Sequence, residues 1–165
     1  LNTGSGVVFA TKRWTIEGFA GLSDILSKKL ETKVMLLGGP EEEIRNREIF
    51  DLTKMKPVNI GTNHCLTHFA AIVSMCDLLV TGDTLALHFA IGLGVPTVAI
   101  FTSTCAQELD LYGKGLKMVA DVECTPCYRS SCGDMKCASS ISASDVFDAC
   151  VEILRKTKDT RLKVR

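Results

Sequence analysis

The sequence lacks an excess of charge of either sign. Lysine and arginine together number 19, and so do aspartate and glutamate. No overall field therefore attracts the chain to nucleic acid or to an anionic membrane, and any charged ligand must be recognised locally. The chain also lacks the dinucleotide-binding pattern G-x-G-x-x-G and the phosphate-loop pattern G-x-x-x-x-G-K-[ST]. A nicotinamide-dependent dehydrogenase and a Walker-type ATPase are therefore disfavoured.

No hydrophobic run of membrane-spanning length is uninterrupted. The most apolar stretch, residues 78–101, contains Asp83, His88 and Pro96. These residues favour a strand, a helix and a second strand in water over a transmembrane helix. No signal peptide is visible either, which favours a cytoplasmic location.

Length and composition indicate one domain. The chain has 165 residues, of which 46% are hydrophobic, so it can bury one substantial core. Residues 1–165 are therefore predicted to form a single domain. The chain begins at Leu1, and residues 1–4 look like the end of a strand that enters a glycine loop, so we expect a fragment of a longer protein.

Strand and helix patterns alternate along the chain. The expected helices cover residues 16–30, capped by Thr15, then 41–53, 66–75, 84–94 and 143–156. The expected strands cover residues 34–37, 58–60, 77–81, 95–101 and 116–119. This alternation, with right-handed crossovers, predicts an α/β fold: a Rossmann-like open parallel sheet with helices on both faces.

Residues 81–88 form the most informative motif. They read as the end of a strand, a turn and the start of a helix, and the free N–H groups of such a helix can hold a phosphate. Asp83 is a candidate N-cap, and His88 lies one turn further along. Taken alone, a plain cap and a helix histidine with satisfied hydrogen bonds would be the simpler interpretations.

Three further motifs are each weak alone. Gly4-Ser5-Gly6 follows a strand and could bring backbone amides to a phosphate, or it could be an ordinary tight turn. Lys12 precedes the first helix and could meet a diphosphate, although most lysines are simply exposed. Glu41 could accept hydrogen bonds from ribose hydroxyls, or it could supply only a favourable charge at a helix start. Trp14 is expected to pack.

Residues 123–138 form a cysteine-rich loop. Two, four and four residues separate its cysteines, which are Cys124, Cys127, Cys132 and Cys137. Four such thiolates could complete a tetrahedral, structural zinc site, while disulfides and free thiols remain open. The remaining four, Cys65, Cys76, Cys105 and Cys150, are expected to pack as small apolar residues.

Taken together, the motifs resemble a known family. Their order and spacing look like the carboxyl-terminal half of lipopolysaccharide heptosyltransferases, glycosyltransferase family nine, from about Leu1 to Cys137. The resemblance rests on the segments Gly4-Ser5-Gly6, Thr11-Lys12-Arg13-Trp14, Leu36-Leu37-Gly38-Gly39-Pro40-Glu41 and Gly82-Asp83-Thr84-Leu85-Ala86-Leu87-His88.

The resemblance implies a GT-B glycosyltransferase, in which two Rossmann-like domains face each other across a cleft. This chain would be the donor-binding half of an enzyme that moves heptose from ADP-heptose to the inner core of lipopolysaccharide, with inversion and without a required metal. The general base would belong to the amino-terminal domain, so the isolated chain would bind donor weakly and catalyse little. The acceptor would be a lipid-anchored glycan, which implies a peripheral position at the inner face of the cytoplasmic membrane.

The resemblance also carries roles to individual residues. Ser5, Gly6 and Lys12 would meet the diphosphate or the sugar. The amides of residues 84–86 would cradle the phosphates. These residues are Thr84, Leu85 and Ala86, and Leu85 stands where the family commonly has glycine. Its amide can still donate.

Four more residues receive donor-binding roles from the resemblance. Glu41 would bind the ribose and His64 would lie near the adenine, while Asp83 and His88 would flank the sugar-diphosphate.

Two other functions compete with this interpretation. One is a nucleotide-binding α/β module with a structural zinc knuckle and no transferase activity. The other is a structural domain with a degenerate site, which would bind no nucleotide. The balanced charge, and the absence of interleaved aromatic and basic residues around the cysteines, count against a nucleic-acid partner.

Overall fold

A computed structural model describes residues 1–6 and 8–163, with side chains described as far as Thr157. The longer helices are α1 (Ile16–Leu30), α2 (Glu43–Leu52), α3 (Leu66–Ser74), α4 (Leu85–Leu93), α5 (Lys136–Ser139) and α6 (Ala143–Lys163). Three short 3-10 helices are η1 (Ala10–Lys12), η2 (Pro40–Glu42) and η3 (Ala106–Glu108). The strands are β1 (Met35–Leu36), β2 (Val58–Asn59), β3 (Leu79–Gly82), β4 (Thr97–Phe101) and β5 (Gly115–Val119).

The strands pair in parallel, and the first residues of the chain join their two groups. β1 pairs with β2, while β3, β4 and β5 pair in that order. Between β1 and β3, Asn2 forms a parallel bridge with Leu37, and its N–H donates to the carbonyl of Val80 at 2.9 Å. Residues 1–3 therefore take the place of a central strand. The order from edge to edge is β2, β1, residues 1–3, β3, β4 and β5, which is the order of a Rossmann sheet.

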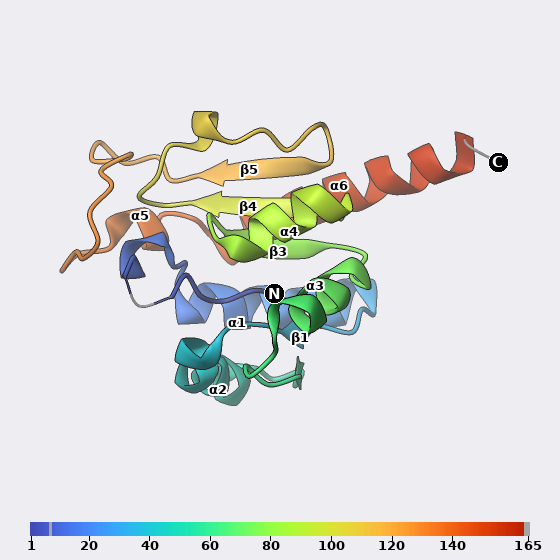
Figure 1. The fold of residues 1–165 in the computed structure, drawn as a ribbon, viewed down its shortest axis with the longest axis horizontal. Coiled ribbons are helices and arrows are strands. Elements are labelled where there is room, and N and C mark those ends of the chain that lie inside the picture. The colour runs from blue at the N-terminus through green and yellow to red at the C-terminus, as the bar shows by residue number, and fades with distance from the viewer. Residues whose placement is uncertain (7, 164–165) are drawn as a thin grey trace.

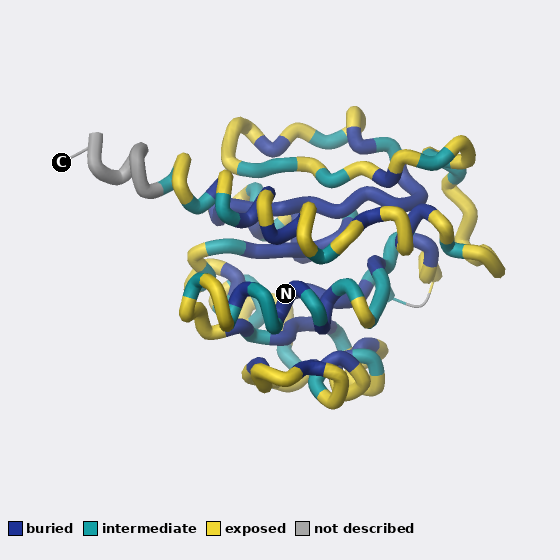
Figure 2. Tube along the Cα trace, turned by 180° about the vertical axis from the view of Figure 1, so that it is seen from behind, coloured by how far each residue is buried: buried dark blue, intermediate teal, exposed yellow. Residues whose placement is uncertain are grey.

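Helices cover both faces of this sheet (Figure 1). Buried side chains of α1, α2 and α6 pack with Val80, Val98 and Ile100 on one face. Side chains of α3 and α4 pack on the other face, with Leu79 among their contacts. Neighbouring residues of β3 thus point to opposite faces, as the pleat requires. In Figure 2 the central strands form the most deeply buried part of the chain.

Local sequence signals explain how α1 begins and where it packs. The Thr15 hydroxyl accepts a hydrogen bond from the Gly18 N–H at 2.9 Å, so Thr15 is the predicted N-cap. Just before it, Trp14 is 2% exposed and donates from Nε1 to the Ile141 carbonyl at 3.0 Å. Its ring meets that of Phe19 edge-on, with centroids 5.0 Å apart. The prediction that Trp14 packs is confirmed.

The predicted fold class is confirmed, and every predicted helix and strand is present. Three local predictions are wrong. Asp83 is not the N-cap of α4, because Thr84 occupies that position. Cys137 lies in the short helix α5 rather than in a loop. The last helix does not end at residue 156 but continues to residue 163.

Within the described residues, no helix combines the length and the apolar character needed to cross a membrane. The stretch 78–101 is divided among β3, α4 and β4, as the sequence predicts.

Candidate functional site

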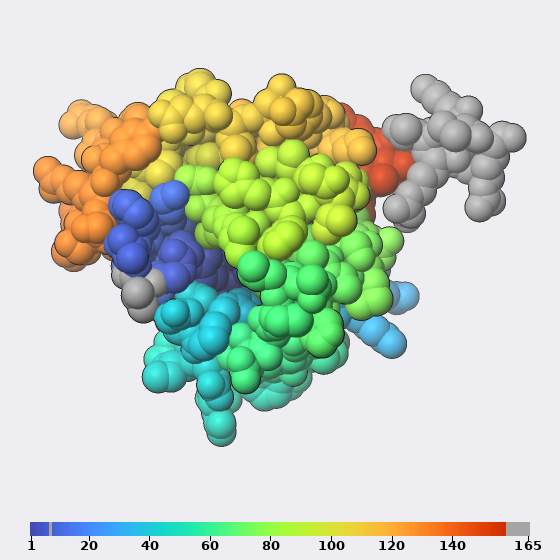
Figure 3. All heavy atoms as spheres, in the orientation of Figure 1, coloured from blue at the N-terminus to red at the C-terminus, as the bar shows by residue number. Residues whose placement is uncertain are grey.

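A cavity of about 460 Å³, lined by charged, polar and apolar residues, opens at the carboxyl ends of the strands. It lies where the chain order of the sheet reverses, between residues 1–3 and β3, which is where ligands bind in open α/β sheets. Four segments border the same hollow in the space-filling view (Figure 3). The lining residues of the first segment lie within 2–6 and 9–12, and those of the others lie within 38–42, 64–69 and 83–86.

The amino terminus of α4 forms one wall of the cavity. Thr84 is extended at φ −144°, and the helix begins at Leu85. The amides of the first helical turn have no carbonyl of a preceding turn to bond, so those of Leu85 and Ala86 are suited to an anion. The Thr84 hydroxyl lies 3.0 Å from that of Thr81, and Asn2 donates to it from Nδ2 at 3.3 Å.

Lys12 and Asp83 form an ion pair at the cavity. The Lys12 Nζ lies 2.8 Å from Asp83 Oδ2, and the two side chains are 22% and 20% exposed. The same ammonium lies 5.3 Å from the centre of the Phe9 ring. Because Asp83 turns toward Lys12, its carboxylate is unavailable as a helix cap. Gly82 allows the main chain of Lys12 to come close to the end of β3, because a Cβ on Gly82 would lie only 2.8 Å from the Lys12 carbonyl oxygen.

Glu42 is a buried residue at the site that the sequence does not single out. It is 3% exposed, while its neighbours Glu41 and Glu43 are exposed. Its carboxylate accepts hydrogen bonds from the N–H groups of Gly6 and Gly39. Nothing in a run of three glutamates tells which one turns inward, so sequence reasoning missed it.

Nine of the ten predicted donor-binding residues line the cavity. They are Ser5, Gly6, Lys12, Glu41, His64, Asp83, Thr84, Leu85 and Ala86. The tenth, His88, is exposed one turn further along α4 and lies outside the lining. His64 is partly buried, and its Nε2 lies 3.0 Å from the Ile60 carbonyl oxygen. The structure therefore gathers segments from four parts of the sequence at one place.

The lining also includes apolar residues that the sequence did not assign. Phe9, Leu66 and Phe69 give the cavity an apolar wall beside its polar groups. Leu66 is 62% exposed, which is unusual for a leucine at the start of a helix that packs on a sheet. A planar base could lie against such a wall while the polar groups bind phosphate.

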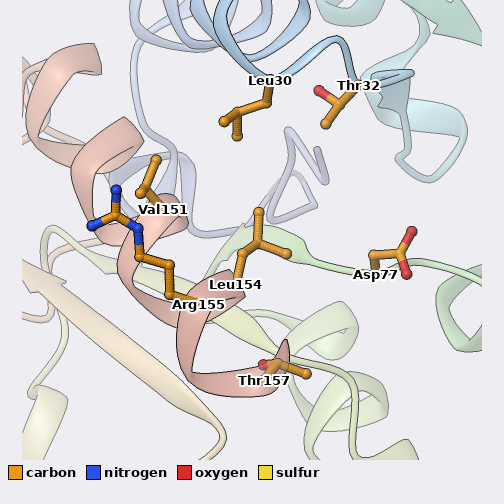
Figure 4. Close-up of a pocket in the computed structure, with 7 residues that line it drawn as sticks. All are labelled: Leu30, Thr32, Asp77, Val151, Leu154, Arg155 and Thr157. Carbon is orange, nitrogen blue, oxygen red and sulfur yellow. The ribbon is translucent and has the colours of Figure 1, made fainter. Parts of the chain in front are cut away.

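A second cavity lies at the opposite edge of the sheet. It has a volume of about 450 Å³ and is lined by Leu30, Thr32, Asp77, Val151, Leu154, Arg155 and Thr157. The aliphatic side chains of Leu30, Val151 and Leu154 face one another there (Figure 4). Asp77 precedes β3, so this cavity is at the amino ends of the strands. It lacks the helix amides and the glycine turns of the first cavity.

The four clustered cysteines do not form a metal-binding arrangement in this structure. In the described residues, no three Cys, His, Asp or Glu side chains converge as a set of ligands, and the thiols are all unbridged. Backbone N–H groups of Met135 and Asp134 lower the pKa of Cys132, whereas burial raises the pKa of Cys137. The zinc site stays a prediction from spacing alone.

The cysteine-rich loop nevertheless touches the site. The Thr11 hydroxyl donates to the Arg129 carbonyl, and the Thr102 hydroxyl donates to the Thr11 carbonyl at 2.6 Å. The residue next to Lys12 is therefore held between β4 and the loop.

The other cysteines differ in their surroundings. Cys150 is 0% exposed, and burial raises its pKa to about 12. Burial also raises the pKa of Cys76. The expectation that Cys65 packs is wrong, because its thiol is exposed at the start of α3. Its pKa is lowered, chiefly by the Thr67 hydroxyl and next by a backbone N–H of His68.

Comparison with known proteins identifies the family to which this chain belongs. Glycosyltransferase family 9 (heptosyltransferase) matches residues 4–138, most of the chain. The chain belongs to glycosyltransferase family 9. The matched range contains all ten predicted donor-binding residues and the cysteine-rich loop.

Similar proteins of this family cover the chain almost end to end. Lipooligosaccharide heptosyltransferase 2 of Campylobacter jejuni subsp. jejuni serotype O:2 is 27% identical over 164 residues, which are 95% of this chain and 51% of that protein. The family 9 glycosyl transferase of Veillonella parvula DSM 2008 superposes with a TM-score of 0.76 at 26% identity, over 94% of this chain and 45% of that one. An E. coli ADP-heptose lps heptosyltransferase II shares the fold, with a TM-score of 0.74 at 20% identity. The match covers 95% of this chain and 46% of that one. This family 9 chain therefore spans about half the length of the curated relatives it matches.

Proposed function

We propose that this chain is the carboxyl-terminal, donor-binding half of an inverting heptosyltransferase with the GT-B architecture. Its donor would be a nucleotide sugar resembling ADP-heptose, and the complete enzyme would extend the inner core of lipopolysaccharide. The observation that carries this proposal is the convergence, around one cavity at the switch point of the sheet, of nine residues to which the family resemblance assigns donor-binding roles. The names of the similar proteins support a heptose donor, and one of them includes ADP-heptose.

The size of the cavity and its mixture of charged and apolar lining residues suit such a donor. Its volume of about 460 Å³ lies within the range of small-molecule and cofactor sites. In the proposed complex, Glu41 binds the ribose and His64 lies near the adenine. The amides of Leu85 and Ala86 meet the phosphates, while Asp83 lies beside the sugar-diphosphate.

The chemistry of glycosyl transfer gives a reason for a cation such as Lys12 beside the amino terminus of α4. When the glycosidic bond to the donor breaks, negative charge builds up on the departing nucleoside diphosphate. Lys12 and the first amides of α4 are fixed before the reaction, and donors aimed at developing charge lower the barrier most. These groups would take the part that a metal ion plays in other glycosyltransferases, so we propose that transfer requires no metal.

The remaining parts of the reaction are assigned to the rest of the enzyme. A carboxylate in an amino-terminal domain would deprotonate the acceptor hydroxyl, a step that contributes about two to four orders of magnitude to the rate. The present chain would then bind donor and catalyse little or no transfer. Its partners would be that domain and, through it, a lipid-anchored glycan at the cytoplasmic face of the membrane. We propose no role in nucleic-acid binding.

Calorimetric titration of the chain with ADP, UDP and GDP tests the proposal. We expect ADP to bind more tightly than UDP and GDP, because adenine is the base assigned to the apolar wall and His64. Lys12→Ala should weaken ADP binding by about tenfold or more, as expected for the loss of a hydrogen bond to a charged group. Lys28→Ala is the matched control, because Lys28 is exposed on α1, away from the cavity lining.

No binding at millimolar concentrations of any of the three nucleotides would contradict the proposed donor site. Equal loss of affinity in Lys12→Ala and Lys28→Ala would contradict the role of Lys12, because only nonspecific attraction to positive charge would remain.

A further inference from the structure

Glu42 places a negative charge in the wall of a cavity that is proposed to hold an anion. Burial of an unpaired carboxylate is costly, and a nearby diphosphate would add repulsion. The residue is only 3% exposed, so solvent does not screen it fully. A buried charge at this place therefore needs partners, and the structure supplies them.

The carboxylate joins the two glycine turns that border the cavity. Oε1 accepts a hydrogen bond from the Gly6 N–H at 3.2 Å, and Oε2 accepts one from the Gly39 N–H at 3.0 Å. Gly6 belongs to the turn that follows residues 1–3, and Gly39 to the turn that follows β1. The Glu42 side chain thus connects the turns that follow residues 1–3 and β1, which are neighbours in the sheet.

Arg13 completes the attachment of the first turn. Its Nη2 donates to the Gly6 carbonyl at 2.7 Å and lies 3.5 Å from Glu42 Oε1. The N–H and the carbonyl of Gly6 are therefore held by the two opposite charges of one ion pair. Gly6 has a φ of +68°, a conformation that glycine adopts without strain.

The glycines of both turns make room for this carboxylate. A Cβ on Gly4 would lie 1.9 Å from the Glu42 Cδ, and one on Gly38 would lie 2.6 Å from the Glu42 Cβ. Neither position can carry a side chain while Glu42 stays in place. From the sequence, Gly4 and Gly6 could serve either the approach of a phosphate or an ordinary tight turn. In the structure, the Gly6 amide donates to Glu42 instead.

We propose that Glu42 is a positioning residue that fixes both glycine turns for the donor diphosphate without binding the donor itself. The inference rests on the proposed donor site, because it assigns the diphosphate to this end of the cavity. With both oxygens occupied by backbone amides and Arg13 beside it, the carboxylate orders Ser5 and the turn after β1. Loss of this order should weaken binding of the diphosphate more than binding of the nucleoside.

Glu42→Gln tests this role, with Glu43→Gln as the matched control. Both changes remove one negative charge, and Glu43 is an exposed neighbour outside the cavity lining. The first readout is hydrogen exchange of the nucleotide-free chain. We expect faster exchange at the Gly6 and Gly39 amides in Glu42→Gln and unchanged exchange in β3 and β4, whereas general destabilisation would accelerate exchange throughout.

The second readout is calorimetric affinity for ADP and for adenosine. Glu42→Gln should bind ADP about tenfold more weakly, as expected for lost hydrogen bonds to a charged group, and adenosine with little change. Glu43→Gln should leave both affinities unchanged. Unchanged protection of Gly6 and Gly39 in Glu42→Gln would overturn the inference. Unchanged or tighter ADP binding in that variant would also overturn it.

Arg13→Lys provides a second test should Glu42→Gln fail to fold. It keeps the positive charge but cannot bridge the Gly6 carbonyl and Glu42 with a planar guanidinium. We expect the same selective loss of ADP affinity, and an unchanged ratio of ADP to adenosine affinity would overturn the inference. Failure of the wild-type chain to bind ADP would instead contradict the proposed function. The exchange measurement would still decide whether Glu42 holds the turns.

Discussion

The ammonium of Lys12 lies 2.8 Å from the carboxylate of Asp83, although 71 positions separate the two residues in the sequence. The pair ties η1, which precedes α1, to the turn between β3 and α4. Both side chains remain about one-fifth exposed, so a ligand in the cavity can reach them. The ion pair thus sets the position of a cation beside the helix amides before any ligand arrives.

A double-mutant cycle should detect this pair in the stability of the chain. Lys12→Met, Asp83→Asn and the double variant are expected to give a coupling free energy of about 1 kcal/mol, the upper end for pairs near the surface. Urea denaturation at low and high salt measures it, and the coupling should shrink at high salt. Lys136 and Asp134 lie 2.9 Å apart but are 73% and 58% exposed, so their cycle should give nearly zero. Equal coupling in the two cycles would contradict the prediction.

Gly82→Ala should disturb the same region through sterics alone. The added Cβ would lie 2.8 Å from the Lys12 carbonyl oxygen, so the backbone must shift. We expect a loss of about 1–3 kcal/mol in the free energy of unfolding, typical of overpacking, together with weaker ADP binding. Gly92→Ala is the control, because its Cβ would meet nothing within 4 Å near the carboxyl end of α4. It should stabilise the chain slightly through helix propensity. Equal effects of the two changes would rule out the steric explanation.

Trp14→Phe should reveal the hydrogen bond from the indole. Removal of Nε1 leaves the Ile141 carbonyl without that donor in a buried place, at a cost of about 1–3 kcal/mol. Thermal and urea unfolding measure the loss. Tyr112→Phe, at a side chain that is 73% exposed, should change stability by less than about 0.5 kcal/mol. A Trp14→Phe variant as stable as the wild type would contradict a net contribution of this hydrogen bond to stability.

The cysteines should react with iodoacetamide in an order set by their pKa values and exposure. The thiolate is the reactive form, so a lowered pKa extends reaction to lower pH. Cys65 and Cys132 have lowered pKa values and are exposed, so they should be labelled first at neutral pH. Burial raises the pKa of Cys150 to about 12, so it should be labelled only after unfolding. Mass spectrometry of peptides between pH 6.5 and 9 reads the order, and early labelling of Cys150 would contradict it.

Periodic hydrophobic patterns were sufficient to predict the layers of the fold. The helical spacing of Phe19, Leu22, Leu26 and Leu30 predicted α1, and the first three are buried while Leu30 is partly buried. The carboxyl ends of parallel strands meet at one edge, so motifs placed after strands could be predicted to converge. The sequence could not show that Leu1–Thr3 lies between β1 and β3, because this depends on pairing with strands far along the chain.

Side-chain partners within the site were less predictable than its location. Asp83 and Thr84 are both residue types that favour N-caps, and the sequence could not show that Asp83 pairs instead with Lys12, from another part of the chain. The buried member of Glu41, Glu42 and Glu43 was set by the two glycine turns that close around it. Such choices depend on tertiary contacts that no local pattern encodes.

The central position of residues 1–3 has a consequence for the order in which the protein folds during synthesis. These residues leave the ribosome before their partners, because Leu37 and Val80 are added later. The central part of the sheet cannot close until β3 has been made, and long-range parallel pairing of this kind is intrinsically slow. The Gly4-Ser5-Gly6 turn gains its neighbours only at that point, so the end of the cavity formed by this turn should be among the last parts of the nascent chain to become ordered.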